Sequence, residues 1–309
     1  MIVTLTVNPA IDKTITVDRL VFDDRSYVTS SSESAGGRGI NASCVIHSFG
    51  GKTIAIVPAG GTSGGHFEHF LTSCGFDLVV VPIRNQVRTN LIITDKHGLT
   101  VKLNEHGATL DKAELARLEK VVASKLTGVS WLMLCGSLPP GVPASFYARL
   151  IKLAHQRKVK TLLDTDGPPL AAGIDAGPTV VKPNQQEAER LLNTPLLTRT
   201  HFLEAASRIR SMGAESVILS LGSRGAVGAF DHQMIEAIPA HVDAVSPIGA
   251  GDAMAAAFAW AMERKTDFRD ALRWGVAAGT ASARLPGLRF ATLAQTEEAY
   301  KRVEVRQAD

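Results

Sequence analysis

The stretch SPIGAGDAMAAAFAWAM, residues 246–262, joins a glycine turn to an alanine-rich helix. Small residues at 249–251 let the backbone approach a ligand closely. The start of the helix offers unpaired N–H groups and the positive end of the helix dipole, which together favour an anion such as phosphate. Asp252 is then an acid beside an anion site. The alternative, that it only stabilises the helix dipole, stays open from these residues alone.

The length of 309 residues fits one large globular domain or two modest ones, and we expect a single domain over residues 1–309; the composition excludes several classes of partner. The chain is 45% hydrophobic and 20% charged, and its 33 Lys and Arg residues nearly balance 30 acids. This balance argues against a nucleic-acid partner. No apolar run has the length of a membrane span, and the start MIVTLTVNPA lacks a basic leader. Cys44, Cys74 and Cys135 form no CxxC pair, which is typical of reduced thiols in a cytoplasmic protein.

Alternating strand and helix patterns predict an α/β fold, a doubly wound and mainly parallel sheet with helices on both faces. Short β-branched runs recur along the chain, beginning with residues 2–7. Glycine or polar residues follow several of these runs, around Asp12, Gly36, Ser137, Asn184 and Asp252. In such sheets the carboxyl ends of the strands converge on one crevice, where ligands bind. The sequence therefore predicts a single site at that edge.

One antiparallel hairpin interrupts this pattern. Residues 88–94 and 100–104 read as two strands that turn at Lys96-His97-Gly98. With residues 14–31 they could form a small separate sheet, a lid made of about 12–34 and 84–106. Arg88 and Asn90 point to the same face of the first strand. At the other end of the chain we expect a closing helix over 293–303, and we read Pro168-Pro169 as a loop.

Two further segments carry candidate site residues. In SAGGRGIN, residues 34–41, three glycines within four residues imply close backbone approach, and Asn41 is either a site residue or a helix cap. Its spacing differs from the GxGxxG fingerprint. Asn184 and Glu187 lie three residues apart at a helix start. They suit a water-coated Mg²⁺ or a capping box, and the two readings are compatible.

Other short patterns are set aside. Gly51-Lys52-Thr53 resembles the end of a Walker A loop, but Ile46 stands where the opening glycine is needed. Residues 61–65, GTSGG, fit the GxSxG of hydrolases without a matched acid and base nearby. His66 and His69 share a helix face but lack an evident third zinc ligand.

Taken together, the motifs resemble those of the PfkB carbohydrate kinases, which have the ribokinase-like fold. The segments that carry the likeness span nearly the whole chain: GGRGIN, PAGG, SLPPGV, VKPNQQE, SLGSRGA and GAGD. The likeness is strongest to the hexose-phosphate branch, whose members phosphorylate fructose 6-phosphate, fructose 1-phosphate or tagatose 6-phosphate. The resemblance implies an ATP-dependent sugar-phosphate kinase that uses Mg²⁺. It also implies a lid that contributes to a homodimer, since exposed lid strands invite edge pairing.

The resemblance also implies roles for individual residues. Asp252, in the turn that begins at Gly249, would be the catalytic base, and Ala250 and Gly251 would give N–H groups to the transferring phosphoryl group. Residues for ATP would be Lys182, Asn184, Ser220, Gly222, Ser223, Gly225 and Gly251. Asn184 and Glu187 would hold Mg²⁺ through water. Residues for the sugar would be Asp12, Gly36, Gly37, Asn41, Asn90 and Ser137. Arg25, Arg38 and Arg88 would bind the phosphate already on the substrate, and Lys182 could reach either phosphate.

The chain departs from the family pattern in places. Ser246-Pro247-Ile248 precedes the GAGD motif and Ala253 follows it, where Thr or Ser and Val, then Ser, are common. Ile92 stands where some 1-phosphofructokinases carry a basic residue, which favours a 6-phosphate ketose. Arg38 replaces a common lysine and offers a planar fork to phosphate.

Two other functions stay open. A kinase of an unphosphorylated sugar or nucleoside would make poor use of three arginines. A silent sugar-phosphate-binding regulator would have no need of Asp252, Asn184 and Glu187.

Overall fold

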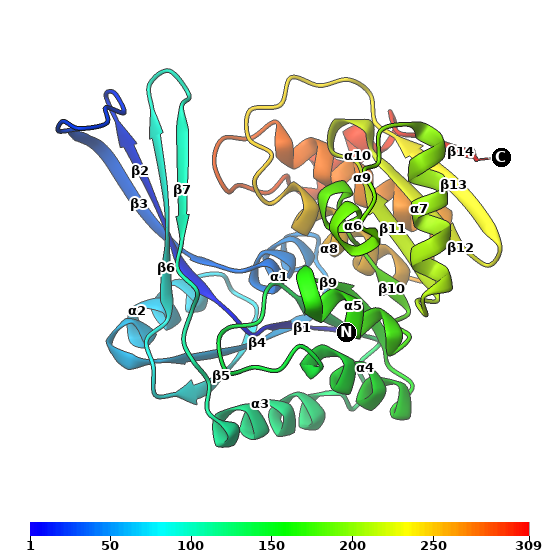
Figure 1. Cartoon of the computed structure of the whole chain (residues 1–309), viewed down its shortest axis with the longest axis horizontal. Helices are drawn as coiled ribbons and strands as arrows, with labels where there is room; N and C mark the ends of the chain where they lie inside the picture. The colour runs from blue at the N-terminus through cyan, green and yellow to red at the C-terminus, as the bar shows by residue number, and fades with distance from the viewer. Residues whose placement is uncertain (309) are drawn as a thin grey trace.

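The computed structural model describes residues 1–308 and contains one large sheet with helices on both faces (Figure 1). Seven neighbouring strands of this sheet run parallel, and three antiparallel strands extend one edge. The doubly wound, mainly parallel sheet expected from the sequence is confirmed. From edge to edge the strands are β14 (Glu304–Gln307), β13 (Gln233–Ile238), β12 (Ala226–Phe230), β11 (Ser216–Ser220), β10 (Val180–Val181), β9 (Lys160–Asp164), β8 (Trp131–Cys135), β1 (Ile2–Thr6), β4 (Thr53–Gly60) and β5 (Asp77–Ile83).

Successive residues of each central strand point to opposite faces of the sheet, so each face carries its own apolar core. In β8, Leu132 and Leu134 belong to one core, and Trp131 and Met133 to the other. The first core is covered by α3 (Lys112–Lys125), α4 (Phe146–Gln156), α5 (Gly167–Asp175), α6 (Gln185–Leu192) and α7 (Arg199–Ser211). The opposite face is covered by α1 (Arg38–Ser48), α2 (Gly61–Thr72), α8 (Ala250–Glu263), α9 (Phe268–Ala283) and α10 (Leu293–Tyr300).

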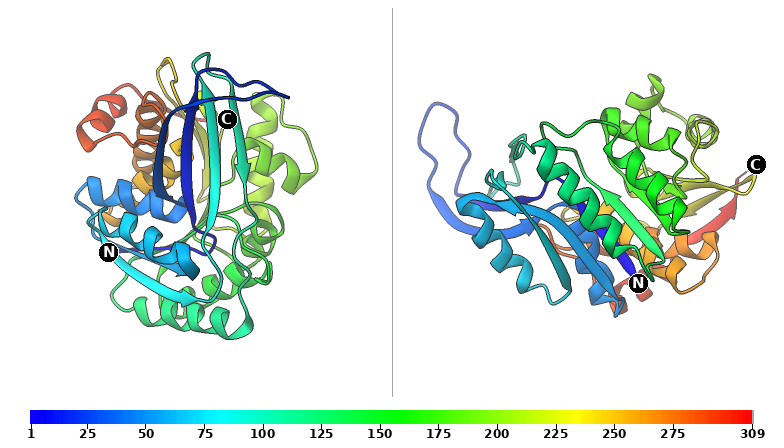
Figure 2. Two further views of the ribbon diagram at one scale, coloured as in Figure 1. Left: turned by 90° about the vertical axis from the view of Figure 1, so that its left-hand side faces the viewer. Right: turned by 90° about the horizontal axis from the view of Figure 1, so that it is seen from below.

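A second sheet of four strands projects from the body (Figures 1 and 2), and we refer to it as the lid. It consists of β3 (Val28–Gly36), β2 (Ala10–Val17), β6 (Arg88–Asp95) and β7 (Thr100–Asn104), in that order. The hairpin β6–β7 pairs with β2, as the sequence suggested for residues 14–31. The helix α1 packs against both β3 and α8, and so it lies between the base of the lid and the body (Figure 1).

Two expectations about local structure are wrong. The Pro168-Pro169 segment opens α5 rather than forming a loop, because proline lacks only an N–H that a first helical turn leaves unpaired. The closing helix ends at Tyr300, and residues 304–307 form β14, which pairs with β13 at the edge of the sheet. A four-residue strand is too short to show a clear periodic pattern. Its pairing partner lies about seventy residues earlier in the chain, so no nearby residue predicts the strand.

No helix within residues 1–308 is long and apolar enough to cross a membrane. The three cysteines are free thiols, as their spacing suggested; Cys135 is buried, and Cys44 and Cys74 are half-buried.

Candidate active site

The N-terminus of α8 is shaped by Gly249. This residue has a φ of 78°, a left-handed conformation that favours glycine, and a Cβ there would also require Leu288, 2.8 Å away at Cδ1, to shift. The first-turn N–H groups of Gly251 and Asp252 have no partner inside the helix, whereas the N–H of Ala250 donates to the carbonyl of Pro247 at 3.3 Å. The amides of residues 251 and 252 are therefore the ones available to an anion.

Asp252 is held at this helix start by a neighbouring helix. Nδ2 of Asn41, in α1, donates a hydrogen bond of 2.7 Å to Oδ2 of Asp252. Burial raises the pKa of Asp252 to about 6, and the nearby Asp164 carboxylate adds to the rise. The Asn41 hydrogen bond and the charges of Arg38 and Lys182 oppose it. A carboxyl group with a pKa this close to neutrality is suited to accept a proton.

This pKa predicts an acid limb in the pH profile. If Asp252 must be ionised to accept a proton, activity is lost as the pH falls through about 6, by about tenfold per unit below it. A profile of kcat/KM between pH 4.5 and 9 checks this. A profile that stays nearly flat down to pH 4.5, as a base with the ordinary aspartate pKa of 3.8 would give, would remove Asp252 from the role of base.

A second group of charges lies at the carboxyl ends of β9 and β10. Asp164, the last residue of β9, accepts from Arg38 Nη1 at 2.9 Å and pairs with Lys182 Nζ at 3.1 Å. Nη2 of Arg38 also contacts Asp166 at 3.0 Å and Glu187 at 3.1 Å. Asp164 and Lys182 are almost fully buried, so each charge depends on the other.

Asn184 and Glu187 form the capping box of α6. Oδ1 of Asn184 accepts the N–H of Glu187, and Oε2 of Glu187 accepts the N–H of Asn184, both at 2.9 Å. Since Oε1 of Glu187 contacts Arg38, each of these side-chain oxygens already has a protein partner. No group of three or more metal-ligating side chains that could hold an ion is found in residues 1–308. The oxygens of Asn184 and Glu187 thus suit a hydrated Mg²⁺ that they contact through its water molecules. They do not suit an ion that the free protein binds directly.

Both groups border one cavity of about 540 Å³. Its polar end is formed by Asp252, Gly251 and the charged residues around Lys182. Beyond this end, small and apolar residues of α9 and of the segment before α8 line the walls. The turn Gly222–Arg224, between β11 and β12, borders it too. Expected ATP residues that line the cavity are Lys182, Asn184, Ser220, Gly222, Ser223, Gly225 and Gly251. A cavity with one charged end and apolar walls is suited to a nucleotide.

Another polar cluster lies at the base of the lid. Asn90 Nδ2 donates to Oδ1 of Asp12 at 2.8 Å, and Arg88 Nη2 donates to the carbonyl of Asn8 at 3.0 Å. Nδ2 of Asn8 in turn reaches Oγ of Ser137 at 3.1 Å. Gly36 contributes by its lack of a side chain, because a Cβ there would clash with the Asp12 carboxylate. Burial raises the pKa of Asp12, against the opposing effects of Asn90 and Arg88.

The expected substrate residues are thus brought together only in part. Asp12, Gly36, Arg88, Asn90 and Ser137 share the cluster at the lid base, and Asn41 joins the neighbouring α1 to Asp252. Gly37 has a φ of 137° and immediately precedes α1.

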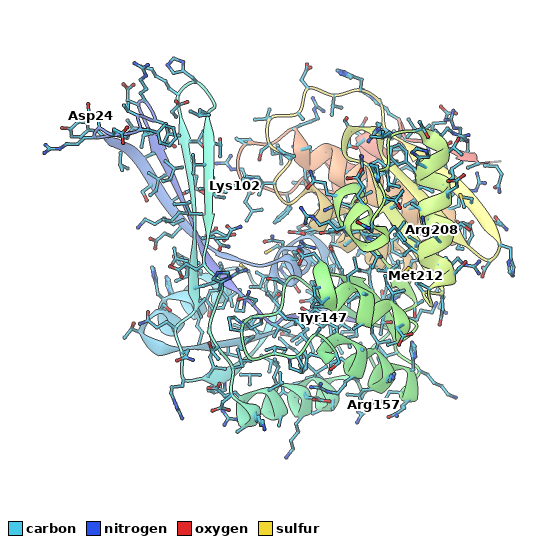
Figure 3. All side chains as sticks on the ribbon, viewed as in Figure 1. Asp24, Lys102, Tyr147, Arg157, Arg208 and Met212 are labelled. Carbon is cyan, nitrogen blue, oxygen red and sulfur yellow. The ribbon has the colours of Figure 1, made fainter. Side chains whose placement is uncertain are left out.

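Two of the three arginines lie elsewhere. Arg25 is exposed and follows Asp24, which lies at the far end of the lid (Figure 3). Arg38 is held by three carboxylates and lines the large cavity. The argument from three arginines for a phosphorylated substrate therefore rests mainly on Arg88.

Sequence reasoning missed three polar residues of the site, Asn8, Asp164 and Asp166. A signal for the two acids was present, because they come directly at the carboxyl end of a buried parallel strand. Asn8 follows β1 in the same way, but it reads as a turn residue before Pro9.

Comparison with known proteins agrees with this geometry. The model of the "pfkB family carbohydrate kinase" matches residues 5–295. ATP-dependent 6-phosphofructokinase isozyme 2 of Escherichia coli is 32% identical over 302 residues, covering 97% of both chains. Tagatose-6-phosphate kinase of Staphylococcus epidermidis is 28% identical over 99% of both chains. Phosphofructokinase-2 from Escherichia coli, solved in complex with fructose-6-phosphate, superposes with a TM-score of 0.89 at 31% identity, over 97% of this chain and 98% of that one. The chain belongs to the pfkB family of carbohydrate kinases.

Proposed function

We propose that this protein transfers the γ-phosphoryl group of ATP to a hydroxyl of a ketohexose phosphate, with fructose 6-phosphate or tagatose 6-phosphate as the favoured substrate. The observation that carries the proposal is Asp252, held by Asn41 beside the free amides of α8 at the charged end of the cavity. The family supplies the reaction class, and the names of the relatives support a hexose phosphate.

In this mechanism Asp252 accepts the proton of the attacking hydroxyl. The amides of Gly251 and Asp252 steady the transferring group, because a helix N-terminus stabilises the negative charge on its oxygens. Lys182, fixed by Asp164, supplies a cation close to Gly251, since its Nζ would lie 3.7 Å from a Cβ built there. Phosphoryl transfer depends mainly on in-line positioning and charge neutralisation, so these groups are sufficient protein chemistry.

Mg²⁺ would accompany the nucleotide, and when bound it neutralises phosphate charge. Glu187 and Asp166 would contact its water shell, since their oxygens lie at the charged part of the site. The sugar would lie over Asp12, Asn90 and Ser137, with Arg88 toward its phosphate. An ATP-dependent enzyme acting on sugar phosphates works in the compartment that holds both, so we infer a cytoplasmic location.

A coupled assay for ADP release tests the function directly. The panel contains fructose 6-phosphate, tagatose 6-phosphate, fructose 1-phosphate, unphosphorylated hexoses and nucleosides. We expect turnover with a 6-phosphate ketose and with neither the neutral sugars nor the nucleosides. Turnover with unphosphorylated acceptors alone would overturn the proposal, and tight binding without turnover would assign a regulatory role. A preference for fructose 1-phosphate would show that Ile92 does not decide the substrate.

We also infer that the protein is a homodimer through its lid. Large apolar side chains are exposed on the lid strands and their loops, among them Phe22, Tyr27, Val28 and Leu103. A four-stranded sheet with this much exposed apolar surface is suited to pairing with a second copy.

The dimer predicts a charge-sensitive interface. The double change Val28→Asp and Leu103→Asp should weaken self-association by at least about a hundredfold, because two carboxylates would lose their water on pairing. Light scattering after size exclusion measures this. Leu197→Asp is the matched control, since Leu197 is also an exposed apolar residue but lies between α6 and α7. A monomeric wild type, or a double variant that stays dimeric, would overturn the inference.

A further inference from the structure

Two cysteines that are distant in the chain meet beside α1. Cys44 lies in the middle of α1, and Cys74 lies in the turn that follows α2. The S–H of Cys44 donates a hydrogen bond to the sulfur of Cys74, and both side chains pack against one apolar cluster that includes Val57 of β4. Because the sulfurs are already within hydrogen-bond distance, a disulfide between them needs only a short further approach.

The residues around the pair hold the turn against this part of α1. His47 follows Cys44 by three residues, so the two share a face of the helix. A Cβ built on Gly75 would lie 3.2 Å from Nε2 of His47. The ring of Phe76 meets the ring of His47 edge-on, with their centroids 6.3 Å apart. The two residues after Cys74 therefore fix it opposite Cys44.

The two thiols differ in reactivity. The hydrogen bond from Cys44 lowers the pKa of Cys74 to about 7, against the opposing effect of burial. The same hydrogen bond, together with burial, raises the pKa of Cys44 well above its ordinary value of 9.0. Near neutral pH a thiolate, the reactive form, thus lies beside a thiol. Both side chains are half-buried, so a small oxidant can reach them, whereas Cys135 is 1% exposed and shielded.

We propose that Cys44 and Cys74 are a peroxide-sensitive pair that forms a reversible disulfide between α1 and the turn after α2. The thiolate of Cys74 attacks one oxygen of hydrogen peroxide, the O–O bond breaks, and the other oxygen leaves as hydroxide and takes up a proton to give water. The sulfur of Cys44 then attacks the resulting sulfenic acid, whose hydroxyl leaves with the Cys44 proton as a second water. One peroxide is reduced by two electrons, and two thiols are oxidised to one disulfide.

The pair lies one helical turn from the contact that holds the proposed base. Asn41 precedes Cys44 by three residues on α1, and its amide donates to Asp252. Closing the disulfide draws α1 and the turn toward each other, so we expect oxidation to disturb that contact. A misplacement of about 1 Å can lower a rate by about a hundredfold. This consequence rests on the proposed kinase function, whereas formation of the disulfide does not.

Mass spectrometry of folded protein treated with hydrogen peroxide at pH 7.5, without nucleotide or sugar, tests the disulfide itself. The wild type should lose two thiols per chain, and its peptide map should join residues 44 and 74 of the same chain. Cys44→Ser should stop at a sulfenic acid on Cys74, which dimedone traps. Cys74→Ser should lose thiols at least about tenfold more slowly, because the thiolate is gone. The matched control, Cys135→Ser, should form the disulfide at the wild-type rate.

The proposal is overturned if folded wild type forms no bond between residues 44 and 74, if the bond joins two chains, or if Cys74→Ser is oxidised as fast as the wild type. The kcat for ADP release is then compared before oxidation, after it and after dithiothreitol. We expect a loss of at least about tenfold that the reductant reverses, and no such loss in Cys44→Ser or Cys74→Ser. A disulfide that leaves kcat unchanged would overturn the link to Asp252. A failure of the ADP-release assay would leave the thiol measurements unchanged, which separates this proposal from the proposed function.

Discussion

Replacing Asp252 with asparagine should lower kcat by 10²–10⁴, in the usual range for loss of acid–base help. We expect the larger figure, because Asp252 would both accept the proton and orient the attacking hydroxyl. The amide is close in size and can still contact Asn41 through its oxygen, so the geometry of the helix start is retained. Substrate binding should therefore change little, and the loss should fall on kcat rather than on KM.

The matched control is Asp175→Asn, the same change at an exposed acid at the end of α5. It should leave kcat within about twofold, as expected of surface changes away from the chemistry. An Asp252→Asn enzyme that retains a tenth or more of the wild-type rate would show that another group accepts the proton.

The same variant has a stability signature that a structural role for Asp252 would not produce. Folding raises the pKa of Asp252 from 3.8 to about 6, so the folded state favours the neutral acid. The free energy of unfolding therefore falls as the pH rises from 3.8 to about 6. Asparagine is neutral throughout. Asp252→Asn should therefore be at least as stable as the wild type at pH 8, and urea unfolding at pH 4 and pH 8 measures the difference. A loss of stability at pH 8 would mean that the ionised carboxylate supports the fold.

Several features of the site could be predicted because they are local in sequence. The glycine turn before α8, the acid in its first turn and the capping box of Asn184 and Glu187 all lie within a few residues of one another. Hydrophobic runs reveal buried parallel strands, and the rule that ligands bind at strand ends then brings distant motifs together. These two steps led to the correct fold, and they place the candidate site at the carboxyl ends of the strands.

The pairing of charges could not be predicted in this way. Arg38 and Asp164 are 126 residues apart, and their contact depends on how α1 packs against the large sheet. Arg38 at the start of a glycine-rich segment suggests a phosphate ligand, but the tertiary structure surrounds it with carboxylates. In the same way β14 forms only because β13 offers it an edge. Local sequence patterns do not predict partners that are distant in the chain.

The second large effect is expected at Asp164, through stability. Asp164→Asn should lower the free energy of unfolding by about 3–5 kcal/mol, the usual cost of removing one partner of a buried ion pair. The loss arises from Lys182, which is 3% exposed and would keep a buried, unpaired charge. Within residues 1–308, Asp164 is the one carboxylate within ion-pair distance of its Nζ. Asparagine can offer an oxygen but not the charge. Urea unfolding at pH 7.5 measures the loss, and a matched change in an exposed pair, Glu298→Gln beside Lys301, should leave the midpoint unchanged.

The Asp164 variant should also move the pH profile, which a purely structural role would leave in place. The charge of Asp164 is one cause of the raised pKa of Asp252, and its removal leaves the charges of Arg38 and Lys182 to lower that pKa further. The acid limb of kcat/KM should therefore shift from about 6 toward the ordinary aspartate value in whatever fraction of the variant stays folded. A variant as stable as the wild type, with its limb still at about 6, would mean that Asp164 neither compensates Lys182 nor acts on Asp252. In that case the prediction that Asp164 acts on the pKa of Asp252 would be wrong.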